Sequence, residues 1–361
     1  MKTPCRLDPA ALDEAFACAG RQVADGIVPF VVLAVADRRD LVRLEAFAGP
    51  SAPRIHVDAI CLLASITKPI VATGVMQLVA DGQVALTDSI LRYIPESAAP
   101  GLSEVTIWHL LSHTSGIPDV DLRQLLLDGV RRVDLMRLVS GTPPRFPPGS
   151  RYEYASSTYD LLAAVFERVT GESHPVYLRR AIFEPLGMVD TTFDPWDRLG
   201  DRVAPLAASA VPGGDGPWGQ MPLTGEQQHS FSELAPAGAG LFGTARDLVR
   251  FGRAMLCGGE LDGARILASP YVTLMTREQT TGSLGASPDP LLAEHYALGW
   301  GKPDPRTSPA SSAAFGHGGI TLTRLWIDPE HDLVFVYLSG IWDHAPRPVD
   351  LVLQAVYGAL R

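Results

Sequence analysis

Sequence patterns typical of buried strands occur near both ends of the chain and are absent from its middle. Residues 27–38, "IVPFVVLAVADR", are rich in β-branched residues, and a second strand pattern follows at 41–49. Near the other end, residues 323–340, "TRLWIDPEHDLVFVYLSG", contain two apolar runs joined at 328–331, which predicts a β-hairpin. Short helical patterns interrupted by Pro and Gly fill the middle, to about residue 234. The sequence therefore predicts one sheet built from both ends of the chain, with a helical region inserted.

The length of 361 residues favours two lobes over one compact unit. We expect residues 1–80 and 235–361 to form an α/β lobe that contains the sheet, and residues 81–234 to form a helical lobe. Gly-rich and Pro-rich residues 201–238 predict long loops. Helices are predicted over 9–25, from Ile70 to about 81, from Ser103 or Thr106 to Gly116, over "YDLLAAVFERVTG" with Gly171 as its C-cap, over 244–259 with Thr244 as its N-cap, and from Pro348 to Leu360 with Leu351, Val352 and Val356 packed on an apolar surface.

Composition excludes several classes of protein. The net charge is −10 without a strong cluster of Lys and Arg, so we expect no nucleic-acid partner. No run of about eighteen apolar residues predicts a membrane helix, and the first twenty residues lack the pattern of a secretion signal. The cysteines are scattered without a C-x-x-C pair, which is typical of reduced thiols in a cytoplasmic protein; they are Cys5, Cys18, Cys61 and Cys257. We therefore expect a cytoplasmic protein without a metal site.

The stretch "ASITKPIVATG" places Ser65 and Lys68 three residues apart at the start of a helix. Residues at this spacing share a helix face, so the two side chains can meet. A serine hydroxyl needs an adjacent base to act as a nucleophile, and a desolvated lysine with a lowered pKa is such a base. The alternative is ordinary: a serine or threonine caps the helix, and the lysine is a solvated charge.

Two further segments carry side chains or backbone groups suited to acyl transfer. In "PPGSRYEYASSTYDLL", Tyr154 and Ser156 precede a helix, where a tyrosine near a lysine and a serine could relay protons. In "FGHGGITLTRLW", His317, Gly318 and Gly319 open a strand whose free N–H groups could hold an oxyanion. Taken singly, the first segment is also compatible with core packing and the second with a simple turn.

Two other patterns suggest sites that we do not favour. "GAGLFG", residues 238–243, matches the dinucleotide-binding glycine pattern, but no apolar strand precedes it. His109 and His113 have the spacing of a zinc helix, but no Glu follows His109 and no third ligand is evident. The glycine match is therefore weak, and a structural role is expected for the two histidines.

Taken together and in order, the motifs closely resemble the serine β-lactamase and penicillin-binding-protein superfamily. Within it, they are similar to the class C branch, which also holds family VIII carboxylesterases, D-aminopeptidases and related acyltransferases. The blocks that carry the resemblance are "ASITKPIVATGVMQLVADGQVALTDSI", "VTIWHLLSHTSGIP", "PPGSRYEYASSTYDLLAAVFERVTGES", "IFEPLGMVDTTF", "AGLFGTARDLVRFGRAML" and "FGHGGITLTRLWIDPEHDLVFVYLS".

The resemblance implies a fold and a set of site residues. The fold would be α/β (α+β), with a mainly antiparallel sheet flanked by helices, an inserted all-helical lobe, and the active site in the cleft between the lobes. Ser65 would be the nucleophile, Lys68 its proton acceptor and Tyr154 a second acid/base. His317, Gly318 and Gly319 would form a substrate-side strand. The oxyanion would be held by the N–H groups of Ser65 and Ile320.

Two departures from the β-lactamase pattern concern the substrate. Ser156 replaces the asparagine of Y-x-N and is too short to offer the amide that holds an acylamino group. His317 replaces the lysine of K-T-G, and a largely neutral histidine is a weaker anchor for a substrate carboxylate. Both departures favour weak or absent β-lactamase activity, while leaving the residues for acyl transfer in place.

We therefore expect a serine hydrolase that needs no cofactor. Among serine hydrolases, the sequence favours a carboxylesterase that acts on small-molecule esters. An acyltransferase or a D-peptidase or amidohydrolase, acting on amides or lactams at the same site, is the alternative among enzymes. A non-catalytic penicillin-binding-like sensor is the alternative of another class. The acyl and leaving groups would be chosen by loops at 118–130, 201–238 and 276–295, whose sequences match no pattern.

Overall fold

The computed structural model describes residues 7–361 except 51, 53, 98, 121–128, 130, 209–224, 281–294 and 343–347. Parts of all three loops expected to select the substrate, and Cys5, lie outside the described residues. Among the described helices, none is long and apolar enough to cross a membrane.

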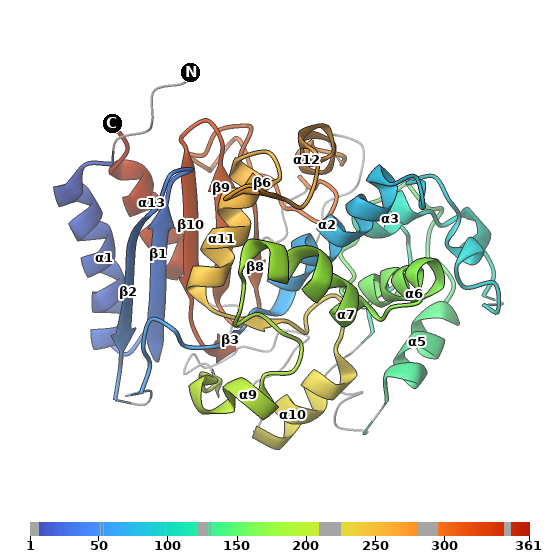
Figure 1. The fold of residues 1–361 in the computed structure, drawn as a ribbon, viewed down its shortest axis with the longest axis horizontal. Helices are drawn as coiled ribbons and strands as arrows, with labels where there is room; N and C mark the ends of the chain where they lie inside the picture. Colours follow the sequence, from blue (N-terminus) through green and yellow to red (C-terminus); the bar gives the residue numbers. More distant parts are fainter. Residues whose placement is uncertain are drawn as a thin grey trace.

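A five-stranded antiparallel sheet joins the two ends of the chain, as predicted (Figure 1). Its strand order is β2-β1-β10-β9-β8, and β1 pairs with β10 in the register Val32 to Leu338. The strands are β1 Phe30–Ala36, β2 Leu41–Ala48, β8 Phe315–Gly319, β9 Thr323–Asp328 and β10 Leu333–Leu338. The α/β fold class with a mainly antiparallel sheet is therefore confirmed, as is the β9–β10 hairpin.

Helices cover both faces of the sheet, which explains why β1 is buried along its whole length. Alternate residues of a strand point to opposite faces. Val31, Leu33 and Val35 pack with α1 Pro9–Ala24 and α13 Pro348–Gly358, whereas Val32 and Ala34 belong to the larger core that includes α11 Ala245–Leu256 (Figure 1). This double burial accounts for the continuous apolar run in the sequence.

The other described elements lie between or beside these strands. The helices are α2 Thr67–Ala80, α3 Ile107–Leu111, α5 Arg132–Ser140, α6 Thr158–Thr170, α7 His174–Leu178, α8 Glu184–Leu186, α9 Trp196–Leu199, α10 Gly225–Leu234 and α12 Ser269–Thr276, with short turns η1 Ala64–Ile66, η2 Ile90–Arg92, η3 Leu102–Glu104, η4 Arg179–Phe183 and η5 Gly200–Arg202. The short strands are β3 Cys61–Leu62, β4 Ala207–Ala208, β5 Phe242–Gly243, β6 Glu260–Leu261, β7 Ala264–Arg265 and β11 Ile341–Trp342. Helix α2 lies between the sheet and the helices α3, α5 and α6 (Figure 1). The two-lobe division at 80/81 and 234/235 stays a prediction.

Most predicted helices are present, but three expectations were wrong in detail. Residues 201–238 do not form loops throughout, because β4 and α10 lie within them. Most residues of α10 are polar, so its sequence shows no clear helical spacing of apolar residues. Helix α3 ends at Leu111 instead of Gly116, since His113 adopts the left-handed conformation with φ 56° and cannot continue a helix. Leu351 is 59% exposed, whereas Val352 and Val356 are buried as expected.

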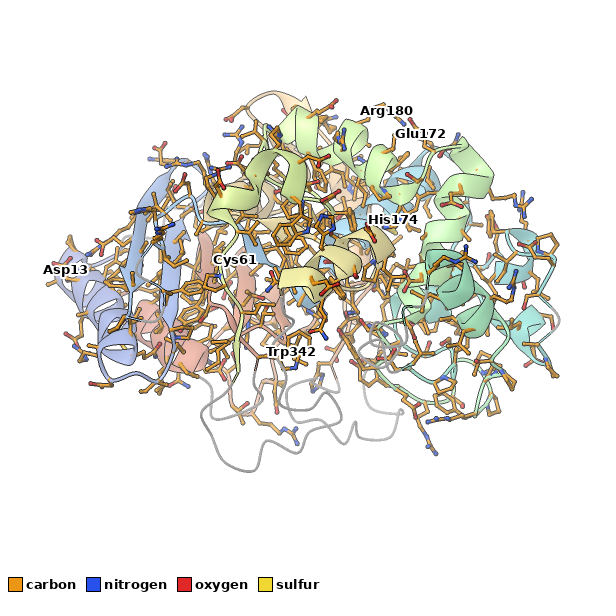
Figure 2. All side chains as sticks on the ribbon, turned by 90° about the horizontal axis from the view of Figure 1, so that it is seen from below. Asp13, Cys61, Glu172, His174, Arg180 and Trp342 are labelled. Carbon is orange, nitrogen blue, oxygen red and sulfur yellow. The ribbon has the colours of Figure 1, made fainter. Side chains whose placement is uncertain are left out.

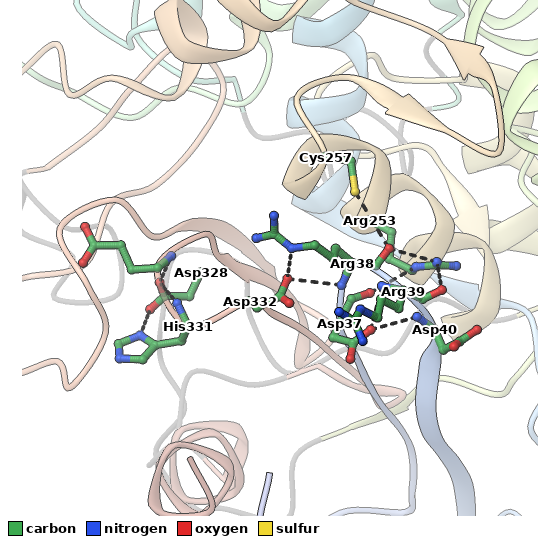
Figure 3. Close-up of polar contacts among 10 residues, drawn as sticks. Asp37, Arg38, Arg39, Asp40, Arg253, Cys257, Asp328, His331 and Asp332 are labelled. Carbon is green, nitrogen blue, oxygen red and sulfur yellow. Dashed lines mark hydrogen bonds and ion pairs between the residues drawn. The ribbon is translucent and has the colours of Figure 1, made fainter. Parts of the chain in front are cut away.

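An arginine and an aspartate tie the β1–β2 turn to its neighbours (Figure 3). From α11, Arg253 donates hydrogen bonds to the carbonyl groups of Asp37, Arg38 and Arg39. Asp332, at the β9–β10 turn, accepts a hydrogen bond of 2.6 Å from Arg38 Nε. The turn at this end of the sheet is therefore fixed by both α11 and the neighbouring hairpin.

Asp328 joins the β9–β10 hairpin to α13 and to the segment before β8. Its carboxylate is fully buried and accepts hydrogen bonds from the hydroxyl groups of Ser311 (2.6 Å) and Tyr357 (2.9 Å) and from His331 Nδ1 (2.8 Å). Although burial alone would raise the pKa of Asp328, these donors lower it below its usual value.

We expect Asp328→Asn to reduce the free energy of unfolding by about 3 kcal/mol at pH 7, because an amide cannot accept all of these charged hydrogen bonds. A carboxyl with a lowered folded-state pKa stabilises the protein above its unfolded pKa of about 3.9, and this stabilisation is lost as the pH falls further. The difference between variant and wild type should therefore shrink below about pH 4.

Urea unfolding at several pH values measures both effects. Asp13→Asn is the control, since the side chain of Asp13 is 71% exposed in its ion pair with Arg43. Asp13 lies at the edge of the molecule (Figure 2), and its substitution should lower the free energy of unfolding by less than about 1 kcal/mol. Equal losses in the two variants, or a pH-independent loss in Asp328→Asn, would contradict the account.

Candidate active site

Ser65 lies in the short turn η1, directly before α2. Its predecessor, Ala64, has a φ of 47°, a left-handed conformation that costs a residue with a side chain about 1 kcal/mol. The Thr67 hydroxyl stabilises this turn, since it donates to the Ala64 carbonyl (2.6 Å) and accepts from the Leu241 N–H (3.0 Å). The strained backbone presents Ser65, which is only partly buried, at the start of the helix.

Lys68 is fully buried at the centre of the site. Its amine lies 3.0 Å from Ser65 Oγ and 2.8 Å from Ser156 Oγ, and it donates a 2.7 Å hydrogen bond to the Gly238 carbonyl. Three segments far apart in the sequence therefore meet at one side chain. The first turn of α2 alone could not bury this lysine. Its contacts with the other two segments explain how a cation is accommodated at a helix start.

The pKa of Lys68 is lowered to about 7, and burial is the main cause. Two carboxylates, Asp119 and Asp160, act in the opposite direction and raise this pKa. A pKa near 7 leaves about half of the Lys68 side chains neutral at neutral pH, so the amine can accept a proton.

Tyr154 contacts both Ser65 and Lys68. Its hydroxyl donates to Ser65 Oγ at 2.9 Å, and the Lys68 amine lies 4.7 Å from the centre of its ring. Burial of the phenol raises its pKa well above 10, so Tyr154 is protonated at neutral pH. The Lys68 amine packs against the face of the same ring.

The segment after Pro236 packs closely on Ser156. A side chain at Gly238 would collide with the Ser156 carbonyl oxygen, so only glycine allows this approach. Asp160, buried in the first turn of α6, accepts a 2.8 Å hydrogen bond from the Ala237 N–H and holds the segment there. The glycine pattern "GAGLFG" thus serves close packing against Lys68.

His317 lies in β8 with both ring nitrogens engaged. Its Nδ1 donates to the Gly318 carbonyl (2.7 Å), and its Nε2 accepts from the hydroxyl of Tyr296 (3.0 Å). Burial and the nearby Lys68 lower the pKa of His317 to about 3, so the ring is neutral at pH 7. No positive charge is present at the position where β-lactamases have the lysine of K-T-G.

Ile320 directly follows β8, in a turn attached to the chain before Ser65. Thr321 Oγ1 donates to the Leu62 carbonyl (2.8 Å), and Thr323 Oγ1 donates to the Leu63 carbonyl (3.1 Å). A side chain at Gly319 would meet the Leu63 carbonyl and Ala64. These contacts bring the Gly319–Ile320 backbone close to the start of α2.

Hydrogen bonds or ring contacts connect Ser65, Tyr154 and Ser156 to Lys68, and the ring of His317 in β8 contacts that of Tyr154. Sequence reasoning missed several of their partners. Gly238 lies in the glycine pattern that was weighed only as a dinucleotide site, and Asp160 lies in the Tyr154 segment but was not singled out. Tyr296 belongs to a segment without a distinctive pattern. His109 forms a capping box with Thr106 instead of a metal site, and the described residues contain no group of three potential metal ligands.

Comparisons with known proteins show the family of this chain. A model of the β-lactamase family matches residues 17–358. Esterase EstB of Burkholderia gladioli is 31% identical over 242 residues, which are 58% of this chain and 60% of EstB. A putative D-alanyl-D-alanine carboxypeptidase of Escherichia coli O157:H7 is 27% identical over 310 residues, or 77% of this chain and 68% of the relative.

Solved structures show the same fold. A penicillin-binding-protein homologue of Caulobacter crescentus has a TM-score of 0.81 at 24% identity, covering 99% of this chain and 100% of its own. A family VIII carboxylesterase has a TM-score of 0.78 at 23% identity, covering 99% of each chain. The chain belongs to the β-lactamase family and, by that membership, to the serine hydrolases.

We expect labelling of Ser65 by a fluorophosphonate to accelerate with pH, with a midpoint near 7, because it requires neutral Lys68. Asp160→Asn should move this midpoint to lower pH, since it removes a negative charge that stabilises the ammonium form while keeping an oxygen for Ala237. Intact-protein mass spectrometry over a pH series measures the rates.

Glu167→Gln is the matched control, because Glu167 is exposed on the same helix, α6. It should leave the midpoint unchanged. A midpoint in Asp160→Asn that is unchanged or raised would show that this carboxylate does not govern the protonation of Lys68.

Proposed function

We propose that this protein is a serine hydrolase that cleaves small, uncharged carboxylic esters through an acyl-enzyme on Ser65. The observation that carries the proposal is the contact of the Ser65 hydroxyl with both a buried lysine of lowered pKa and a protonated tyrosine. The nucleophile thus lies within hydrogen-bond distance of both a base and an acid, as covalent catalysis requires.

In the proposed acylation, neutral Lys68 takes the proton of Ser65 while Oγ attacks the ester carbonyl carbon. The negative charge that develops on the carbonyl oxygen is held by the N–H groups of Ser65 and Ile320. When the C–O bond breaks, the alkoxide takes a proton from Tyr154, and Lys68 returns its proton to Tyr154. In deacylation, Lys68 and Tyr154 take a proton from water as its oxygen attacks the acyl carbon. The bond from this carbon to Oγ then breaks, and the proton passes to Oγ, so that the acid leaves and Ser65 is regenerated.

The preference for uncharged esters rests on two side chains. His317 is neutral, with both ring nitrogens engaged, and so offers no cation to a substrate carboxylate. Ser156 Oγ accepts a hydrogen bond from the Lys68 amine, and a serine lacks the amide of an asparagine. The name of EstB supports an esterase. Membership of the class C branch, which the sequence motifs suggest, is part of the proposal.

A D-peptidase is the second candidate, since one relative is named a putative D-alanyl-D-alanine carboxypeptidase. Its substrate would carry a terminal carboxylate, which the neutral His317 disfavours. Transfer of the acyl group to an acceptor other than water is a variant of the proposed reaction, and a sensor without turnover would stop at the acyl-enzyme.

Two further expectations from the sequence are part of the proposal. The site gathers residues 65–68, 154–156 and 317–320, which supports a helical lobe (81–234) facing an α/β lobe (1–80 and 235–361) across the site. The described cysteines, Cys18, Cys61 and Cys257, carry free thiols, which supports a reducing, cytoplasmic location.

We expect p-nitrophenyl butyrate to add an acyl group to the protein and to be turned over, and Ser65→Ala to lower kcat/KM by about 1,000-fold or more and to abolish the adduct. A cephalosporin and a D-alanyl peptide, tested in parallel, should react more slowly by at least about 100-fold. Each carries a carboxylate, and the neutral His317 provides no positive charge to bind it.

Intact-protein mass spectrometry and product release measure the outcomes, with Ser140→Ala, at the C-terminal end of α5 and outside the site, as the control. An adduct that persists on Ser65→Ala would disprove the nucleophile. Faster turnover of the D-alanyl peptide would favour the peptidase, and a stable adduct without product would favour a sensor.

A further inference from the structure

His113 lies directly behind Tyr154 and has no part in the proposed chemical steps. It follows α3, is 1% exposed, and has a φ of 56°. A histidine adopts this left-handed conformation uncommonly, and strained residues that persist are held by their surroundings. The sequence singled out His113 only as a doubtful zinc ligand, so its place against the site needs another explanation.

His113 accepts hydrogen bonds from both neighbours of Tyr154. The Glu153 N–H donates to the His113 carbonyl at 2.9 Å, and the Ala155 N–H donates to His113 Nδ1 at 3.3 Å. Residues 151–155 belong to no helix or strand, so regular structure does not fix Tyr154. One residue therefore holds the backbone on both sides of the tyrosine.

The imidazole of His113 also packs on the ring of Tyr154, with 4.3 Å between the ring centres and 38° between the planes. The rings of Tyr296 and Tyr159 contact the same imidazole at 4.9 Å and 5.4 Å. Burial and the nearby Lys68 and His317 hold the pKa of His113 well below 6.5, so the ring is neutral. An apolar wall of three tyrosines thus keeps the imidazole in place.

The acceptor role of Nδ1 assigns the proton to Nε2, which is buried without a hydrogen-bond partner among the described residues. An unmade hydrogen bond in the interior costs about 1–3 kcal/mol, so a histidine is a poor choice if only packing is required. What a histidine offers here, and an apolar residue of similar size does not, is the Nδ1 acceptor for the Ala155 N–H.

We propose that His113 is a positioning residue that fixes the Tyr154 hydroxyl against Ser65 Oγ through its carbonyl, its Nδ1 and its ring. The inference rests on the proposed role of Tyr154 as proton donor to the leaving group. The 2.9 Å contact between Tyr154 and Ser65 would then depend on His113, and a displacement of about 1 Å can cost about 100-fold in rate.

Leaving-group dependence separates positioning from general stability. Alkyl esters need a proton on their departing alkoxide, whereas p-nitrophenolate leaves with little help from an acid. His113→Ala should therefore lower kcat/KM for ethyl butyrate by about 100-fold, but for p-nitrophenyl butyrate by less than about tenfold. The same selectivity is expected of Tyr154→Phe, and the double variant should lose little more than either single variant.

Two amide variants test the Nδ1 contact without leaving the site empty. His113→Asn places its Oδ1 near the position of Nδ1 and tolerates a positive φ, so it should recover most of the alkyl-ester activity. His113→Gln places its oxygen near the position of Nε2 and should not. If His113→Ala fails to fold, the alkyl-ester activities and thermal unfolding temperatures of His113→Asn and His113→Gln are compared instead.

His174→Ala is the matched control for removal of a fully buried histidine, since His174 lies in α7, edge-on to Phe193, outside the site (Figure 2). It should lower thermal stability without changing the ratio of the two ester activities.

Three outcomes would overturn the inference. If Tyr154→Phe is selective for the alkyl ester but His113→Ala reduces both esters equally, His113 is only a core residue. Equal activities of His113→Asn and His113→Gln would likewise exclude positioning through Nδ1. If Tyr154→Phe itself shows no selectivity, the proposed role of Tyr154 fails, and the positioning inference fails with it.

Discussion

The burial of the Lys68 amine is the interaction on which the rest of the site depends. An ammonium group without water is costly, and this lysine responds with a pKa near 7 and with hydrogen bonds to Ser65, Ser156 and the Gly238 carbonyl. The contacts that make the amine tolerable in the interior are the same contacts that give Ser65 a base. Stability and chemistry therefore act through a single side chain.

The fold supplies these contacts from segments that are distant in the sequence. Strand β8 comes from near the end of the chain and the turn with Ser65 from its first fifth. Hydrogen bonds from Thr321 and Thr323 to the Leu62 and Leu63 carbonyls hold the end of β8 beside that turn. Left-handed residues mark the places where the backbone is forced into the site: Ala64 before the serine, His113 behind Tyr154, and Leu322 in the turn after Ile320. Strained residues of this kind are typical of functional sites held by a rigid framework, although Asp262 and Asp332 adopt the same conformation in turns away from the site.

Much of this could be predicted from the sequence, for physical reasons that differ between elements. The sheet followed from apolar runs such as β1, because a strand buried on both faces needs apolar residues throughout. The motifs around Ser65 and Tyr154 identified candidate residues because their chemistry and order carry information. Helix α10 and the exposure of Leu351 were missed because a polar helix has a weak period and a single leucine does not reveal its face. Gly238, Asp160 and Tyr296 could not be predicted, since their contacts arise only from tertiary structure.

The protonation state of Lys68 is the central claim, and the composition makes it directly measurable. The chain contains only three lysines, Lys2, Lys68 and Lys302, so a ¹³C NMR titration of lysine Cε labels gives three signals that Lys2→Arg and Lys302→Arg assign. Lys302 is a useful internal reference, because burial lowers its pKa to about 8. The account predicts a midpoint near 7 for Lys68. A midpoint near 10.5, the usual value for lysine, would contradict it.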